Sequence, residues 1–324
     1  MVLDRIKSEL PAFAEKLKGE DNFLLLTHRR PDGDTVATAA ALCRALRCLG
    51  KRAFLCVNPE VTERFKPYYL PYVAPVDFEA ETIVTVDISA PQQFENSQRV
   101  YLDRIDYVID HHRANKLEAS KSRLIDDKAS ATGEIMFYLI RELGVEFDSE
   151  IAEYLYIAVS TDTGCFKYAN TTAETHMIAA ECISVGFDLA AVNTEHFEKK
   201  TMARSKIERL VYEGLSFRAN GRIASIYITQ AMRVQTGATD DDVDEFSSIP
   251  RQIEGVDAGI TVYEQKDGSM KISLRTTACV DASEICAVFG GGGHTRAAGC
   301  TVYGTVEEAI DQLAREIERV FERV

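Results

Sequence analysis

The stretch NFLLLTHRRPDGDTVATAAALCRALRCLG, residues 22–50, decides the fold class. It begins with a short apolar run, passes through a polar loop with one histidine and two aspartates, and continues as an apolar helical pattern that ends at Gly50. A short buried strand that is followed at once by a helix is typical of units in which successive strands run parallel. The segment therefore predicts a parallel sheet that is covered by helices.

The same alternation continues along the first 190 residues. Apolar runs are predicted as strands and capped amphipathic segments as helices, with Ser130 as a candidate N-cap and Gly144 at the end of its helix. We therefore expect an α/β domain whose parallel sheet carries helices on both faces. The expected strands cover 22–27, 53–57, 82–89 and 107–110, and the expected helices cover 37–50, 130–144, 151–164 and 171–186.

The pattern changes after a charged segment, residues 188–217, that is predicted to be wholly helical. Later apolar runs alternate as half-exposed strands do, and a glycine cluster precedes a terminal helix. The acidic run 239–246 is expected to begin a solvated helix. The later strands are expected at 223–229, 258–265 and 270–276. The sequence thus predicts an α/β domain at 1–190, a helical linker at 191–217 and a smaller mixed α+β domain at 218–324.

Composition narrows the function. The 324 residues carry 37 Lys+Arg against 51 Asp+Glu, a formal charge of −14, which argues against gripping long nucleic acid through its phosphates. No apolar run approaches the roughly 20 residues of a membrane span, and no secretory signal is recognised. The eight cysteines form no CxxC pair and are interpreted as reduced core thiols of a cytoplasmic protein.

Acidic and histidine side chains follow the strand ends of the first domain. Since the carboxyl ends of parallel strands meet at one edge of a sheet, these side chains are expected to converge. A single such aspartate is usually a turn residue or a helix cap. So many buried carboxylates together would cost several kcal/mol per unpaired charge unless cations neutralise them. The residues are His28, Asp32, Asp34, Asp87, Asp110, His111, His112 and Asp162.

Two divalent metal ions are the simplest way to neutralise this cluster. Histidine with carboxylate suits Mn²⁺, Mg²⁺, Zn²⁺ or Fe²⁺, and the majority of oxygen ligands favours Mn²⁺ or Mg²⁺. Two such ions about 3.5–4 Å apart activate a hydroxide for in-line attack at phosphorus. The ions, rather than lysines, would then attract an anionic substrate to an acidic protein.

The ordered motifs resemble those of the DHH-superfamily phosphoesterases. HRRPDGD at 28–34, the strand-terminal Asp87, the triplet 110–112 and TDTG at 161–164 match the four motifs in order. GGGGHTRAAG at 290–299 is similar to the hallmark of the DHHA1 substrate-binding domain. The chain departs from the family at Ala37-Thr38, where Gly-Ser is common. The resemblance covers nearly the whole chain and assigns the DHH catalytic domain to 1–190 and the DHHA1 domain to 218–324.

The resemblance implies a role for each residue of the first domain. His112 would sit beside the substrate phosphate, where it stabilises the transition state or protonates the leaving oxygen. Asp110 would either orient a neighbouring histidine or only cap the turn. One metal ion would be held by His28, Asp32 and Asp87, and the other by Asp34, Asp87, His111 and Asp162.

In the second domain the resemblance implies substrate contacts. Consecutive glycines let backbone N–H groups approach a phosphate closely, although a plain tight turn would also use them. Arg275 could grip a terminal phosphate through two hydrogen bonds, whereas Arg296 is a weaker candidate that could simply be solvated. The residues expected to contact substrate are Arg275, Gly291, Gly292, Gly293, His294 and Arg296.

Among members of the family, the chain resembles the stand-alone, two-domain NrnA-type enzymes. These act on short RNA oligonucleotides and on 3′-phosphoadenosine 5′-phosphate (pAp), and linear dinucleotides such as pGpG remain open as substrates. The cofactor implied is a pair of divalent ions, Mn²⁺ ahead of Mg²⁺. Long duplex nucleic acid and membranes are not expected partners, and symmetry statistics favour a homodimer. The alternatives are a cyclic-dinucleotide phosphodiesterase, a RecJ-like single-strand exonuclease and a nucleotide sensor without catalysis.

Overall fold

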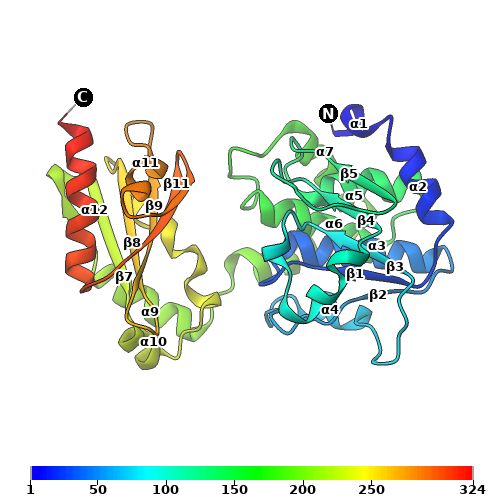
Figure 1. The fold of residues 1–324 in the computed structure, drawn as a ribbon, viewed down its shortest axis with the longest axis horizontal. Helices are drawn as coiled ribbons and strands as arrows, with labels where there is room; N and C mark the ends of the chain where they lie inside the picture. The colour runs from blue at the N-terminus through cyan, green and yellow to red at the C-terminus, as the bar shows by residue number, and fades with distance from the viewer. Residues whose placement is uncertain (1, 323–324) are drawn as a thin grey trace. The chain divides into compact units, whose positions relative to one another are not determined.

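The computed structural model describes residues 2–322, and the chain divides into two compact units at Lys199–Lys200 (Figure 1). The first unit holds a five-stranded sheet in the order β2-β1-β3-β4-β5, and every pairing in it is parallel. The predicted α/β architecture of the first half is therefore confirmed. Its strands are β1 (Phe23–Leu26), β2 (Ala53–Leu55), β3 (Thr82–Val86), β4 (Tyr107–Asp110) and β5 (Ser122–Ile125).

The two faces of this sheet are covered differently. One face packs on α-helices in a core that includes Leu25, Val84 and Ile109. The other face, which includes Leu24 and Val108, packs mainly on 3₁₀ segments and loops. The 3₁₀ segments of the unit are Leu70–Tyr72, Pro91–Gln93 and Asn96–Arg104. Its α-helices are α1 (Val2–Ile6), α2 (Leu10–Lys18), α3 (Gly33–Cys48), α4 (Lys66–Tyr69), α5 (Thr132–Glu142), α6 (Ser149–Asp162), α7 (Ala173–Val185) and α8 (Leu189–Asn193).

The second unit is a six-stranded sheet in the order β10-β11-β9-β8-β7-β6, in which only β7 and β8 pair in parallel. This is the mixed sheet that the sequence predicted. Apolar clusters cover both of its faces. The strands are β6 (Ser216–Arg218), β7 (Ile223–Ile228), β8 (Ala258–Glu264), β9 (Met270–Thr276), β10 (Gly292–His294) and β11 (Ala297–Val302). The helices are α9 (Met202–Glu213), α10 (Gln230–Thr236), α11 (Ala282–Val288) and α12 (Val306–Phe321), with 3₁₀ segments at Asp241–Ser248, Pro250–Gln252 and Ala219–Gly221.

Several sequence-based expectations differ from the structure. Strands β7 and β8 are mostly buried rather than half-exposed, because both faces of their sheet are covered, whereas β9 does alternate. The segment 188–217 is not one helix: a π-helical turn, Thr194–Glu198, follows α8, and the helical conformation stops before α9 begins at Met202. Strand β5 was not predicted, since Ser122 and Arg123 interrupt its short apolar pattern.

Two polar details were also predicted wrongly. Ser130 does not cap α5; its hydroxyl instead donates to the Asn170 carbonyl, and the N-cap position is Ala131. The acidic run forms a 3₁₀ segment in which Asp242 is buried, and the buried carboxylate accepts a hydrogen bond from the backbone N–H of Thr239 at 2.8 Å. The cysteines are free thiols, but Cys48 and Cys279 are exposed rather than in the core.

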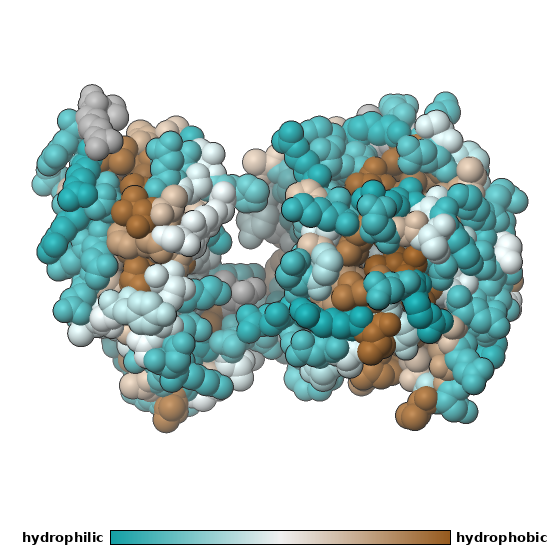
Figure 2. Space-filling view, in the orientation of Figure 1, coloured by the Kyte–Doolittle hydropathy of each residue, from teal (hydrophilic) through white to brown (hydrophobic). Residues whose placement is uncertain are grey.

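The visible surface of each unit exposes mainly polar residues, with apolar residues scattered among them (Figure 2). Among the described residues, no helix combines the length and apolar character that a transmembrane segment requires.

Candidate active site

Residues at the carboxyl ends of three strands, at the start of one helix and at the end of another meet at one edge of the first unit's sheet. His28 lies just after β1, Asp32 and Asp34 lie at the start of α3, and Asp87 follows β3 directly. At Asp87 the backbone turns into the left-handed region, with φ of +59°, which ends the strand. The structure thus brings together the predicted cluster of the first unit. The remaining members are Asp110, His111 and His112 at the end of β4, and Asp162 as the last residue of α6.

Close approach of three helices creates this cluster. A Cβ on Gly33 of α3 would lie 2.4 Å from the Thr161 hydroxyl of α6, and a Cβ on Gly133 of α5 would lie 2.5 Å from the Cβ of Ala158, also on α6. Glycine is therefore required at both positions for the helices to pack at these distances. The packing places Asp34 and Asp162 on adjacent helices at the same edge of the sheet.

Three groups of the described residues have the composition of a metal site, with the ligand atoms of each within 4.8 Å of one another, and the third of them consists of Asp87, His111 and His112. The first contains His28, Asp32 and Asp87, with the His28 Nε2 3.4 Å from Asp32 Oδ1 and 3.6 Å from Asp87 Oδ2. The second contains Asp34, His111 and Asp162, with the His111 Nε2 3.7 Å from Asp162 Oδ2. The first group has the composition of one ligand set that the resemblance implies, and the second has that of the other set without Asp87.

Asp87 belongs to the first group and also faces histidines on the side of the second group. Its Oδ2 faces His28, and its Oδ1 is 3.6 Å from His111 Nε2 and 3.5 Å from His112 Nδ1. The residue is buried, with 3% of its surface exposed. One carboxylate therefore presents a different oxygen to each group, as a carboxylate that bridges two cations does.

The two histidines of the metal-type groups are oriented by backbone carbonyls. His28 Nδ1 lies 2.8 Å from the Arg29 carbonyl oxygen, and His111 Nδ1 lies 3.1 Å from the Ala129 carbonyl oxygen. A carbonyl can only accept, so each Nδ1 carries a proton, and Nε2 is the nitrogen that faces the carboxylates. Nε2 is therefore the atom that a metal ion would take as its ligand.

His112 is oriented by a carboxylate instead. Its Nδ1 donates to Asp110 Oδ1 at 2.7 Å, and Asp110 is fully buried. The other Asp110 oxygen accepts from the side-chain amide of Asn115, whose own Oδ1 accepts from Arg123 at 3.1 Å. Asp110 was expected either to orient a neighbouring histidine or only to cap the turn. These contacts are those of a residue that orients His112.

The electrostatics of the cluster favour cations. Burial, reinforced by the charges of Asp34 and Asp32, raises the pKa of Asp87 well above its ordinary value. Burial also raises the pKa of Asp162 to about 7, with the charge of Asp34 adding to the effect. For His111, burial lowers the pKa, but the charges of Asp34 and Asp162 outweigh it and the net shift is upward. Divalent ions would relieve this concentration of negative charge.

Asp34 has a structural contact that the sequence did not predict. Its carboxylate accepts hydrogen bonds from the backbone N–H groups of Thr132 at 2.7 Å and Gly133 at 3.0 Å, and from the Thr38 hydroxyl at 3.0 Å. Asp34 therefore satisfies the free N–H groups at the start of α5, the task expected of Ser130. Three of the four acceptor positions of the carboxylate are used, which leaves one lone pair for a cation.

Two further polar residues at the site, Asn115 and Thr132, were missed from the sequence. Asn115 holds Asp110, and the Thr132 hydroxyl donates to Asp87 Oδ1 at 2.9 Å. The only sequence signal for Asn115 was its place five residues after Asp110 in the same polar loop. Thr132 could not be recognised, because 45 residues separate it from the carboxylate that it contacts.

The substrate-contact candidates lie in the second unit, on neighbouring strands. His294 of β10 pairs with Ala297 of β11, and Ala297 pairs with Arg275 of β9. Directly paired residues project from the same face of a sheet, so His294 and Arg275 flank the small Ala297 side chain. Arg275 Nη1 donates to the Ser273 hydroxyl at 3.0 Å, and His294 is exposed.

The glycine cluster is part of an edge strand rather than a free loop. A Cβ on Gly291 would lie 2.2 Å from the Gly299 carbonyl oxygen, and one on Gly293 would lie 2.6 Å from the Ala297 carbonyl oxygen. Close packing on β11 is therefore enough to require glycine at these two positions, whereas Gly292 has open space around it. Arg296 is occupied, since its Nη1 donates to the Val280 carbonyl at 2.9 Å.

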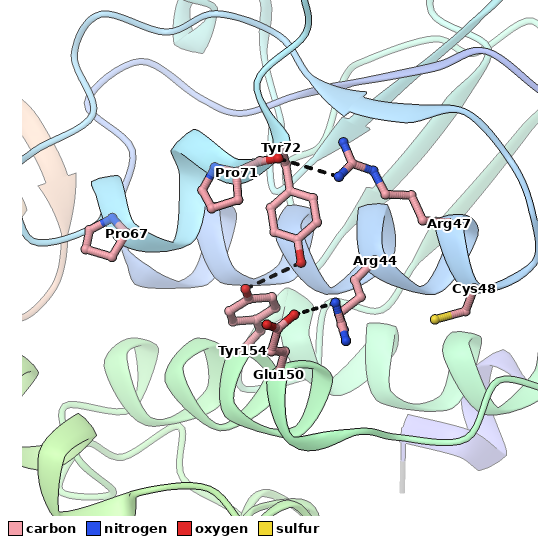
Figure 3. A pocket seen from close by; sticks show the side chains of 8 residues that line it. All are labelled: Arg44, Arg47, Cys48, Pro67, Pro71, Tyr72, Glu150 and Tyr154. Atoms are coloured by element: carbon pink, nitrogen blue, oxygen red, sulfur yellow. Dashed lines mark hydrogen bonds and ion pairs between the residues drawn. The ribbon is translucent and has the colours of Figure 1, made fainter.

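A pocket elsewhere in the first unit is not lined by an acid–histidine cluster. It has a volume of about 490 Å³ and lies by the carboxyl end of α3, about 20 Å along that helix from Asp34. Figure 3 shows that its charged groups have partners: Arg44 pairs with Glu150, and Arg47 reaches the Pro71 carbonyl. The chemistry of the unit is therefore concentrated at the strand ends.

A parallel sheet with an acid–histidine cluster at its carboxyl edge, joined to a separate mixed-sheet unit, is the architecture of a class of phosphoester hydrolases. Residues 22–159 match the model of the DHH family N-terminal domain, and residues 223–323 match that of the DHHA1 domain. The chain belongs to the DHH family and is a hydrolase of the phosphoesterase type.

Named relatives extend this assignment. The chain is similar to the bifunctional oligoribonuclease and PAP phosphatase NrnA of Thermus thermophilus, with 32% identity over 314 residues that cover 96% of this chain and 92% of the relative. It is 26% identical to the enzyme of the same name from Bacillus subtilis, over 92% of this chain and 94% of the relative.

Solved structures support the fold. An exopolyphosphatase-related protein from Bacteroides fragilis superposes with a TM-score of 0.84 at 24% identity, over 97% of this chain and 96% of that one. The exonuclease RecJ of Thermus thermophilus, crystallised with Mn²⁺, gives a TM-score of 0.55 at 14% identity, over 98% of this chain and 54% of RecJ.

Proposed function

We propose that this chain hydrolyses phosphate esters of very short nucleotides, using a pair of divalent cations held by the acid–histidine cluster. The proposed substrates are short oligoribonucleotides, linear dinucleotides and pAp. The observation that carries the proposal is Asp87, whose two carboxylate oxygens face two different groups of candidate metal ligands. Two relatives support the proposal, since the enzymes of Thermus thermophilus and Bacillus subtilis are both named oligoribonuclease and PAP phosphatase.

The donor set fits a pair of hard divalent ions. The two groups offer four carboxylates and two neutral imidazoles, which suits Mn²⁺ and also Mg²⁺. His28, Asp32 and Asp87 would hold one ion, and Asp34, Asp87, His111 and Asp162 the other. When bound, such a pair supplies an activated hydroxide and neutralises charge on the attacked phosphate.

The protein's own groups supply the remaining chemistry. His112 holds its Nδ1 proton against Asp110, so its Nε2 is the atom that can hold or give a proton beside the substrate phosphate. The Asp110–Nδ1 hydrogen bond fixes the orientation of the imidazole ring and therefore the position of Nε2. We assign His112 as the catalytic acid and Asp110 as the residue that orients it.

The second unit supplies candidate contacts to an anionic end of the substrate. Arg275 and His294 project from the same face of the sheet with only the Ala297 side chain between them. The guanidinium can bind a terminal phosphate through two hydrogen bonds, and the imidazole can donate a third. Strand β10 lies at the edge of its sheet, so those of its backbone N–H groups that point away from β11 are available as further donors.

A panel of substrates tests the proposal. With Mn²⁺, we expect pAp, pGpG and a short RNA to be hydrolysed faster than a cyclic dinucleotide or a long single-stranded DNA. Asp87→Asn should lower kcat about 10³-fold, since loss of the shared ligand removes several kcal/mol of charge stabilisation. The matched control is Asp103→Asn, an exposed aspartate outside the cluster, which should retain full activity.

Other outcomes of the same panel would contradict the proposal. Faster digestion of long single-stranded DNA would indicate a RecJ-like exonuclease, and preference for a cyclic dinucleotide would indicate a cyclic-dinucleotide phosphodiesterase. Full activity of the Asp87→Asn variant would show that the cluster does not perform the reaction. Nucleotide binding without turnover in saturating Mn²⁺ would indicate a sensor.

A further inference from the structure

Thr132 contacts two carboxylates of the cluster, those of Asp34 and Asp87. It is fully buried at the first position of α5. Its backbone N–H donates to Asp34 Oδ2 at 2.7 Å, and its hydroxyl donates to Asp87 Oδ1 at 2.9 Å. A single residue thus connects an aspartate at the start of α3 with an aspartate at the end of β3.

The hydroxyl reaches one particular oxygen of Asp87. Oδ1 is the oxygen that faces His111 and His112, whereas Oδ2 faces His28. The imidazole nitrogens near Oδ1 lie at 3.5–3.6 Å, which is longer than an ordinary hydrogen bond. The Thr132 hydroxyl therefore fixes the rotation of the Asp87 carboxylate about its last bond, and it does so from the side of the second metal-type group.

The backbone contact of Thr132 does not depend on its side chain. The N–H groups of Thr132 and Gly133 hold Asp34 whatever residue occupies position 132, except proline. The hydroxyl contact to Asp87, in contrast, is lost in any residue without a γ-oxygen. The two contacts can therefore be separated by substitution, with valine as the variant of nearly the same shape.

We propose that Thr132 is a positioning residue, whose hydroxyl sets the orientation of the shared carboxylate so that the second cation, at Asp34, His111 and Asp162, is bound tightly. This inference rests on the proposed function, since it requires the cluster to hold two ions. The first ion, at His28, Asp32 and Asp87 Oδ2, does not use the oxygen that Thr132 holds. Loss of the hydroxyl should therefore weaken the second site more than the first.

The test is a Mn²⁺ titration of the metal-free protein, followed by electron paramagnetic resonance of free and bound Mn²⁺ and by calorimetry. The wild type should bind two ions. Thr132→Val should bind the second ion 10–100-fold more weakly, the usual cost of losing a partner that orients a metal ligand, and should lose less affinity for the first ion. Thr132→Ser, which keeps a hydroxyl, should restore the second site.

The matched control is Thr85→Val. Thr85 is a fully buried threonine of β3, two residues before Asp87, and its hydroxyl contacts the Tyr107 carbonyl rather than a carboxylate. This variant should bind both ions as the wild type does. Thermal unfolding of the metal-free proteins checks that Thr132→Val is folded, and Thr132→Ala replaces it if it is not.

Three results would overturn the inference. Wild-type affinity for both ions in Thr132→Val would show that the hydroxyl has no positioning role, and the proposed function would be unaffected. Equal weakening of both ions together with lower metal-free stability would show a purely structural role. Fewer than two ions in the wild type would remove the proposed metal pair and this inference with it.

Discussion

At the scale of single residues, the site depends on buried carboxylates, and burial disfavours their ionised form. Asp87 is buried, takes a left-handed backbone conformation and has a pKa well above its ordinary value. Each of these features costs free energy in the metal-free fold. Binding of cations would offset that cost, which links folding of this unit to its cofactor.

Asp110 offers a prediction that separates orientation of His112 from metal binding. In Asp110→Asn, the new amide would place an N–H group against either the His112 Nδ1–H or the Asn115 amide, both of which are donors. We expect kcat to fall about 10–100-fold, as for other partners that orient a histidine, while two Mn²⁺ ions still bind. Steady-state kinetics and a metal titration measure the two effects.

The control for this variant is Asp106→Asn. Asp106 lies four residues before Asp110, but its carboxylate accepts from the Ile83 N–H and the Ser120 hydroxyl, away from the cluster. Its substitution should affect stability more than kcat. A wild-type kcat in Asp110→Asn would show that Asp110 only caps the turn, the other role considered for it.

The aspartates and histidines of the cluster were largely predictable from the sequence, but the residues that hydrogen-bond to them were not. His28, Asp87 and His111 follow predicted strands, and the rule that strand ends converge was enough to place them at one edge. Thr132 and Asn115 act through hydrogen bonds that depend on how α5 and the loop after β4 pack. No local pattern encodes such contacts.

At the scale of elements, helix α5 shows why local capping rules failed. The sequence offered Ser130 as the N-cap, yet the free N–H groups of the helix bind Asp34, a residue 98 positions earlier. Ser130 is then available to bond the Asn170 carbonyl, and Asn170 in turn donates to the Asp162 carbonyl. A cap supplied from a distant element ties helix formation to assembly of the site.

The π-helical turn Thr194–Glu198 contains a histidine whose titration affects stability. The His196 ring stacks on Phe65 with 5.5 Å between centroids, and its Nε2 lies 3.2 Å from the Tyr68 hydroxyl. Burial lowers the pKa of His196 from 6.5 to about 4. Between these pH values the unfolded chain binds a proton that the folded chain does not, so the free energy of unfolding falls as pH drops through this window.

We expect this loss to be about 2–3 kcal/mol between pH 7 and pH 4.5. Urea unfolding in the presence of a chelator, which keeps the cluster metal-free, measures it. His196→Phe should lose less stability over the same range, whereas His176→Phe, at an exposed histidine, should follow the wild type. An unchanged pH dependence in His196→Phe would show that His196 does not titrate as its surroundings indicate.

The glycine cluster was singled out from the sequence, but its conformation was not predicted. Its sequence indicated a loop that approaches phosphate, and the structure forms the edge strand β10. Gly291 and Gly293 are required by packing against β11, while Gly292 is not. Four consecutive glycines give no periodic pattern, so the pairing could only be seen once β11 was in place.

At the scale of the whole molecule, strand–helix alternation was enough to predict the parallel sheet and the separate mixed sheet. The charged segment after Asp188 was harder, because its composition is helical throughout while the chain changes from one unit to the other at Lys199–Lys200. Burial of Ile207 and Val211 places α9 in the core of the second unit. A sequence pattern alone does not show against which core a helix packs.

The formal charge of −14 also has a clearer origin in the structure. Five aspartates gather in the cluster, where cations would cancel part of their charge: Asp32, Asp34, Asp87, Asp110 and Asp162. The remaining surface is still acidic, which disfavours long nucleic acid polymers. The small nucleotides that we propose as substrates agree with both observations.

The most direct test of the account is a crystal structure of the protein grown with Mn²⁺, with data collected on both sides of the manganese absorption edge. We predict two anomalous peaks about 3.5–4 Å apart, one on each side of Asp87. His28 and Asp32 should contact one ion, and Asp34, His111 and Asp162 the other. A single peak, or peaks that Asp87 does not contact, would contradict the two-cation site on which the proposed function depends.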